Sequence, residues 1–153
     1  MIDNRSTPII ATLFMSIILF ASSTFLLLGS ANAQTVTAEI ETATQDVIRD
    51  QINAFQSKEY ERAFSHAAPT IKQIFGTTER FIGMVKGGYS PLYNPDSYLF
   101  GRNFNLDGTI HQEVIATDQN GRQWQAIYTL KQQPDGSWKI TGVKMEPYKG
   151  AAT

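Results

Sequence analysis

The feature that most constrains this chain is a change of hydrophobic period at Tyr98. From that residue on, apolar and polar side chains alternate, and three turn signals interrupt the alternation: Leu106-Asp107-Gly108, Gln119-Asn120-Gly121 and Pro134-Asp135-Gly136. A period of two is typical of strands, and Asp-Gly or Asn-Gly turns join neighbouring antiparallel strands. The pattern therefore predicts a meander with strands at about Tyr98–Asn105, Thr109–Thr117, Arg122–Gln132 and Ser137–Glu146.

The part of the chain before Tyr98 shows helical spacing instead. Thr42 and Gln45 resemble a capping box ahead of a first helix, and Tyr60–Ala67 has one apolar face. A further helix is expected from Pro69 to a stop at Gly76, and the last begins after Thr77 and closes at Gly87-Gly88. The segment 89–95 holds two prolines, so we expect neither a helix nor a central strand there. Helices followed by a curved sheet predict an α+β fold, with the helices packed on one sheet face.

The alternation also predicts which sheet face the helices cover. One phase holds both tryptophans and most of the bulk, and we assign it inward: Ile110, Gln112, Val114, Ala116, Trp124, Ala126, Tyr128, Leu130, Trp138, Ile140 and Gly142. The other phase is mixed, and we assign it outward: His111, Glu113, Ile115, Gln125, Ile127, Thr129, Thr141, Val143 and Met145. An apolar patch of Ile115, Ile127, Val143 and Met145 on the outer face predicts a homodimer interface.

Residues 1–33 have the layout of a secretory signal. Arg5 supplies a positive charge, Ile9 to Leu28 is an uncharged apolar run, and Ala31-Asn32-Ala33 is an A-x-A cleavage site. Cleavage would make Gln34 the first residue of an exported, periplasmic or secreted chain. The alternative is an uncleaved membrane anchor, because the run is long enough to span a bilayer. After the leader we expect a linker at 34–43, one domain at 44–147 and a tail at 148–153.

Composition excludes several classes of function. The chain has no cysteine, which excludes disulfides, thiolate metal sites and a cysteine nucleophile. Its formal net charge of −1 argues against a nucleic-acid partner. The two histidines, His66 and His111, are not at metal-ligand spacing, and no phosphate loop or dinucleotide fingerprint occurs. We therefore expect no metal and no cofactor, and contact with a membrane only through residues 1–33 if they are not cleaved.

Several segments together resemble one family of exported bacterial proteins. They are Ala54-Phe55, Phe75–Phe81, Gly88–Tyr93, Gln112-Glu113-Val114, Tyr128-Thr129-Leu130 and Asp135–Val143. The chain resembles the domain of unknown function 4864 over about residues 44–147. The resemblance implies a cystatin-like α+β cone with a fold like that of nuclear transport factor 2. It implies no activity, because isomerases, dehydratases, ligand binders and dimerisation modules share that fold.

A polar and aromatic group of residues is the candidate site. Gln112 and Tyr128 are polar residues of the inward phase, Trp124 adds an indole, and Tyr89 and Tyr93 lie on the loop expected to cross the mouth between helices and sheet. Apolar walls with a few hydrogen-bonding groups are typical of a small-molecule pocket, here for an apolar or aromatic ligand. The alternative is a filled core in which Gln112 and Tyr128 bond to protein groups.

Three classes of function remain open. The first is a non-enzymatic binding module, and the second is an accessory protein that acts through its outer sheet face as a dimer or on a partner. The third is an isomerase- or dehydratase-like enzyme, which needs a titratable pair in the pocket. The inward phase offers none through the sheet centre, His111 and Glu113 point outward, and the sequence neighbours of His66 supply no orienting carboxylate. We therefore assign no catalytic residue.

Overall fold

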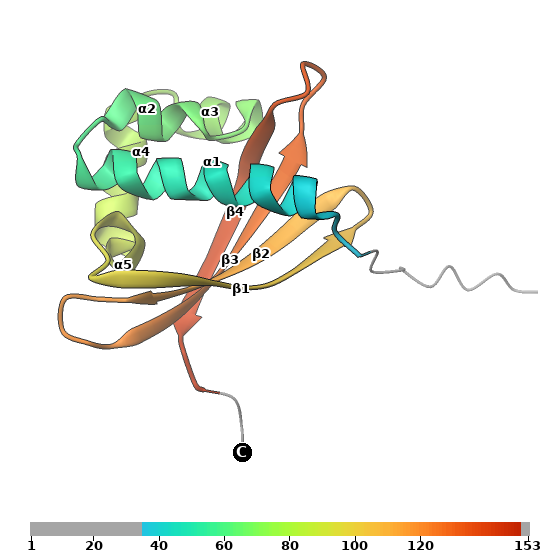
Figure 1. Cartoon of the computed structure of the whole chain (residues 1–153). Helices are drawn as coiled ribbons and strands as arrows, with labels where there is room; N and C mark the ends of the chain where they lie inside the picture. Colours follow the sequence, from blue (N-terminus) through green and yellow to red (C-terminus); the bar gives the residue numbers. More distant parts are fainter. Residues whose placement is uncertain (1–34, 151–153) are drawn as a thin grey trace, which may run out of the picture.

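The computed structural model describes residues 35–150, which form a helical layer over one face of a curved sheet (Figure 1). The helices are α1 (Ala38–Gln56), α2 (Tyr60–Ser65), α3 (Pro69–Phe75), α4 (Thr78–Gly88) and α5 (Ser90–Tyr93). The strands are β1 (Ser97–Leu106), β2 (Thr109–Thr117), β3 (Gln123–Gln132) and β4 (Trp138–Pro147). The predicted α+β fold is confirmed. The predicted signal segment 1–33 lies outside the described residues, and within them no helix is long and apolar enough to cross a membrane.

The sheet is an antiparallel meander in the order β1-β2-β3-β4. Asp107 and Gly108 both have positive φ and form a two-residue loop between the paired residues Leu106 and Thr109. Two successive positive φ values define the primed turn that matches the twist of a hairpin. The strand limits agree with the predicted ones to within a residue, because turn chemistry and alternation are both local signals.

The helices differ from the expectation at two places. Helix α1 begins at Ala38, inside the predicted linker, because Thr37 is its N-cap and accepts a hydrogen bond from the Ile40 amide (3.4 Å). Thr42 is not a cap, since its hydroxyl donates to the Ala38 carbonyl within the helix (2.8 Å). The proline-rich segment contains the single-turn helix α5, in which Pro91 occupies a first-turn position where no amide hydrogen is needed. The limits of α3 and the Thr77 cap of α4 are as predicted.

Two apolar clusters form the core. The first lies between α1 and the inner sheet face and includes Ile48, Ile52, Val114, Tyr128 and Leu130. The second lies among the helices and includes Phe55, Ala63, Phe81, Ile82 and Val85. The inward phase predicted for β2 and β3 is confirmed by the burial of these side chains.

A bulge in β4 overturns part of the predicted outer face. Leu130 pairs with Ile140, but Thr129 pairs with Gly142, so Thr141 is an extra residue on β4. An extra residue reverses the phase of the strand beyond it. Val143 and Met145 consequently pair with Tyr128 and Ala126 and pack against the first core cluster. The outer assignment of Val143 and Met145 was wrong, and the inward assignment of Gly142 was wrong as well, because a Cβ atom there would point outward to the Thr129 hydroxyl.

Candidate functional site

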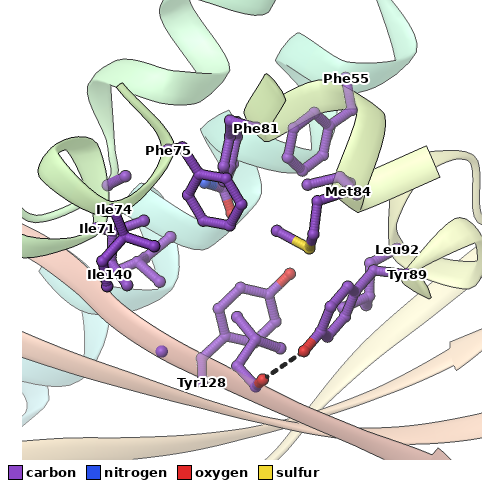
Figure 2. A pocket seen from close by; sticks show the side chains of 15 residues that line it. Phe55, Ile71, Ile74, Phe75, Phe81, Met84, Tyr89, Leu92, Tyr128 and Ile140 are labelled. Carbon is purple, nitrogen blue, oxygen red and sulfur yellow. Dashed lines mark hydrogen bonds between the residues drawn. The ribbon is translucent and has the colours of Figure 1, made fainter. Parts of the chain in front are cut away.

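A cavity of about 330 Å³ lies between the helices and the C-terminal half of the sheet (Figure 2). It separates the second core cluster from β3 and β4, and most of its wall is aliphatic or aromatic. Its lining residues are Gln51, Phe55, Ala67, Ile71, Ile74, Phe75, Phe81, Met84, Val85, Tyr89, Leu92, Tyr128, Ile140, Gly142 and Val143. The volume falls within the range of roughly 300–1,000 Å³ typical of small-molecule sites.

Helix α3 forms the outer rim of this cavity. Ile71, Ile74 and Phe75 all line it, yet α3 contains no buried residue and the Ile74 side chain is 72% exposed. Pro69 starts the helix, and Gly76 ends it in a conformation with φ of 73°. Since Ile74 touches both cavity and solvent, the cavity opens to the surface beside α3.

Tyr128 stands at the floor of the cavity with its hydroxyl turned toward the helices (Figure 2). The residue is 1% exposed, and its hydroxyl makes no hydrogen bond within residues 35–150. No fully enclosed side-chain nitrogen or oxygen of the described chain lacks a partner, so this unpaired hydroxyl borders open space. Burial raises the pKa of Tyr128 well above its ordinary value, which keeps the hydroxyl protonated at neutral pH.

Two other polar groups in the wall are partly or fully paired. The Tyr89 hydroxyl donates to the Val143 carbonyl (3.0 Å), the bond drawn in Figure 2. The Gln51 side-chain nitrogen donates to the Ala63 carbonyl (3.1 Å), and its oxygen Oε1 receives no hydrogen bond from residues 35–150. No Asp, Glu, His, Lys or Arg of the described chain lines the cavity. The lining thus combines apolar burial with one free hydroxyl and one free amide oxygen.

Only two of the five predicted site residues line this cavity, Tyr89 and Tyr128. Gln112 is fully buried elsewhere, and its amide nitrogen donates to the Glu113 carbonyl (2.9 Å) and the Gly101 carbonyl (3.1 Å). Its oxygen accepts from Gln45 (3.3 Å) and Asn103 (3.4 Å). Gln112 is therefore paired within the core, as the alternative of a filled core predicts, and it does not line this cavity.

Trp124 and Tyr93 also lie away from the cavity. The Trp124 indole donates to the Asp118 carboxylate (2.9 Å), and the Arg122 guanidinium covers its ring. The Tyr93 hydroxyl bonds that of Tyr60 (2.9 Å), and Lys86 lies over both rings. Trp124 was predicted from the inward phase of its strand, and Tyr93 from its position on the loop. Each signal places a residue near the helices or the sheet, but neither places it beside a particular cavity.

The cavity residues that the site prediction missed come mainly from α3 and α4. Ile71, Phe75, Phe81, Met84 and Val85 lie on the two helices that the sequence predicted from Pro69 and after Thr77. Their spacing in the sequence is that of ordinary core residues. Only the incomplete packing of α3 distinguishes them from residues of a filled core. Gln51 was detectable as a glutamine on the apolar face that carries Ile48, Ile52 and Phe55.

A charged cluster lies on the outside of the helical layer. The Asp50 carboxylate of α1 bonds Arg62 (2.6 Å) and the Nε2 atom of His66 (2.6 Å). The bond from Arg62, with that from His66, holds the pKa of Asp50 below its ordinary range despite some desolvation. His66 thus has an orienting carboxylate, which its sequence neighbours did not reveal because Asp50 comes from another helix. None of these three residues lines the cavity.

The outer sheet face carries a second polar group centred on Glu113. Its carboxylate accepts from Gln125 and from the Arg102 amide (3.1 Å), and its side chain is 11% exposed. Burial alone raises the pKa of Glu113, but these bonds outweigh it and the pKa is lowered. His111 stacks on Phe104 instead of joining Glu113 (ring centroids 4.8 Å apart). His111 and Glu113 both lie outside the cavity, as the predicted phase requires.

Helices packed on one face of a curved antiparallel meander, with an apolar cavity between the layers, define a nuclear transport factor 2-like domain. A solved structure of an NTF-2-like protein of unknown function from Silicibacter pomeroyi DSS-3 has this fold, with a TM-score of 0.52 and 14% identity. The likeness covers 74% of this chain and 100% of that one, and at this identity it concerns the fold alone. No curated protein matches the chain.

The chain belongs to the family described as Domain of unknown function (DUF4864), which matches residues 37–153. This confirms the family that the motifs indicated. The match begins at Thr37, the N-cap of α1, so it includes residues 37–43 of the segment that we predicted as linker.

Proposed function

We propose that this domain binds a small, largely apolar molecule in the cavity between its helices and its sheet. The observation that carries the proposal is the Tyr128 hydroxyl, which has no partner among residues 35–150 and borders a cavity of about 330 Å³. Leaving a buried hydroxyl unpaired costs about 1–3 kcal/mol. A ligand that fills the cavity covers this hydroxyl, so it avoids that cost only if it pairs with the hydroxyl while it buries the apolar wall.

The ligand enters beside α3 in this proposal. Ile74 is the most exposed large apolar side chain of the described residues, and it lies at the cavity rim. An exposed isoleucine contributes little to folding, so its contribution is expected to appear when a ligand covers it. This gives a site-specific test that leaves the fold intact.

The test compares Ile74→Ser with Leu99→Ser. Leu99 is a matched control, because it is 71% exposed but lies in β1 on the outer sheet face. We would screen the wild type with apolar metabolites by thermal shift and titrate each hit into both variants. Ile74→Ser should weaken binding several-fold and Leu99→Ser should not, while both unfold within about 0.5 kcal/mol of the wild type. Equal effects of the two variants, or a screen without hits, would refute binding in this cavity.

We propose further that the domain acts outside the cytoplasm. The support is the secretory layout of residues 1–33, with the A-x-A sequence at Ala31-Asn32-Ala33. Intact-mass measurement of the chain recovered from a bacterial host tests this, and we expect a first residue of Gln34. A mass that retains residues 1–33 in the membrane fraction would favour the anchor instead.

A second candidate function is assembly through the outer sheet face. Val143 and Met145 no longer belong to that face, but Leu99 joins it, opposite Ile115 in the register of β1 and β2. Phe104 is 40% exposed on the same face, and Ile127 is half-buried on β3. Exposed apolar side chains on one sheet face support a homodimer as the alternative role.

A further inference from the structure

Two residues of the cavity lining, Tyr128 and Gln51, each have a polar atom without a partner among residues 35–150, and the two atoms differ in what they can do. The Tyr128 hydroxyl can donate and accept a hydrogen bond, and burial keeps it protonated. Gln51 is 4% exposed, and its amide nitrogen faces the Ala63 carbonyl, which can only accept. That bond fixes the orientation of the amide and leaves Oε1, an acceptor, without a donor among residues 35–150.

The rest of the described lining carries no charge. Apart from Tyr89, whose hydroxyl is bonded to Val143, the remaining lining residues are aliphatic, aromatic, methionine or glycine. Moving an unpaired carboxylate or ammonium group into such surroundings costs far more than moving a neutral polar group. The lining therefore selects against ions.

From these two atoms we infer that the ligand is a neutral, largely apolar molecule with a hydroxyl group, either an alcohol or a phenol. This inference rests on the proposed binding function. A hydroxyl accepts from Tyr128 and donates to Gln51 Oε1. An ether or a ketone can accept but leaves the Gln51 oxygen without a donor. A carboxylate also lacks a donor, and it brings a charge that the lining does not balance.

The cavity volume limits the size of this molecule. At roughly 30 Å³ per non-hydrogen atom, the share that a water molecule takes in the liquid, 330 Å³ holds about eleven such atoms. A bicyclic phenol and a straight-chain alcohol of medium length both meet this limit. The two compounds differ in shape. A probe set that contains both therefore tests for the hydroxyl group without assuming a particular carbon skeleton.

The experiment uses two matched series of probes and the intact chain at pH 7. One series is 2-naphthol, 2-methoxynaphthalene and 2-naphthoate, and the other is 1-decanol, its methyl ether and decanoate. Dissociation constants are measured by calorimetry or tryptophan fluorescence. In at least one series the hydroxyl compound should bind about tenfold more tightly than its ether and its carboxylate, the ratio expected for one buried polar group left unpaired.

Tyr128→Phe should weaken binding of the alcohol and of its ether by a similar factor, because both accept from this hydroxyl, and the ratio between them, which depends on the Gln51 oxygen, should persist. The variant should fold, since that hydroxyl bonds no described protein group, and Tyr148→Phe on the outer face is the matched control. If ether and alcohol bind equally in both series, the hydroxyl inference is wrong while the binding function stands. If no probe binds, the binding function fails as well. The wild-type series decides the inference even if Tyr128→Phe does not fold.

Discussion

Replacing Gln112 by leucine tests the assignment of this residue to the core. The side chain is fully buried, and its amide nitrogen donates to the Glu113 and Gly101 carbonyls at 2.9 and 3.1 Å. Leucine has a similar size but no donor, so both carbonyls lose this partner. At about 1–2 kcal/mol for each, the free energy of unfolding should fall by about 2–4 kcal/mol. For a domain of this size that is a fall in Tm of about 8–16 °C.

The assay is urea unfolding followed by tryptophan fluorescence. Gln123→Leu is the control, because Gln123 is an exposed glutamine in β3, and it should change stability by less than about 0.5 kcal/mol. Gln112→Leu should also leave probe binding unchanged, since Gln112 does not line the cavity. Unaltered stability combined with weakened binding would refute the core assignment and restore Gln112 as a ligand contact.

Three further variants test features outside the cavity. The pKa of Asp50 is lowered in the fold, so the stability it contributes is present above the ordinary aspartate pKa of about 3.9 and is lost as the pH falls below it. Asp50→Asn should therefore lower stability at pH 5, and the difference from the wild type should shrink toward pH 2 in urea titrations; a difference that does not depend on pH would contradict this. A Cβ atom at Gly101 would lie 2.9 Å from the Glu113 Cδ atom, so Gly101→Ala should destabilise by about 1–2 kcal/mol, and by less in a Glu113→Ala background. If the outer face forms a dimer, Ile127→Asp should give a monomer by light scattering, whereas a wild type that is already monomeric at high micromolar concentration would exclude that dimer.

The sequence by itself determined the strands, their order and most of their faces. The two-residue loop at Asp107 and Gly108 needs positive φ, which these residue types tolerate, and alternation along β2 sets every one of its side chains inward or outward. These signals act over a few residues, so they can be interpreted without knowing how the rest of the chain packs. The segments that resemble the family indicated the same fold independently of the alternation.

The bulge in β4 is the first feature that only the tertiary structure decided. Gly142 follows Thr141, and a glycine inside a strand often marks a bulge, but it does not fix where the extra residue lies. The pairing of β4 with β3 shifts at Thr141 and turns Val143 and Met145 inward. The segment 66–68 packs against the same place, with the Ala68 amide bonded to the Ile140 carbonyl (2.8 Å) and the Ile140 amide to the His66 carbonyl (2.9 Å). A strand phase read from sequence assumes an uninterrupted ladder, and it fails beyond the point where the ladder shifts.

The site itself was also decided by packing between distant segments. Tyr128 and Gln112 are alike in sequence, since both are polar residues of the inward phase on neighbouring strands, and they pair directly in the register. Gln112 bonds to Gln45 of α1 and to the Gly101 carbonyl of β1, whereas the Tyr128 hydroxyl borders the cavity that α3 covers only in part. Whether a buried polar atom finds a partner depends on which groups from other elements reach it. That is a property of the packed chain and not of its local pattern.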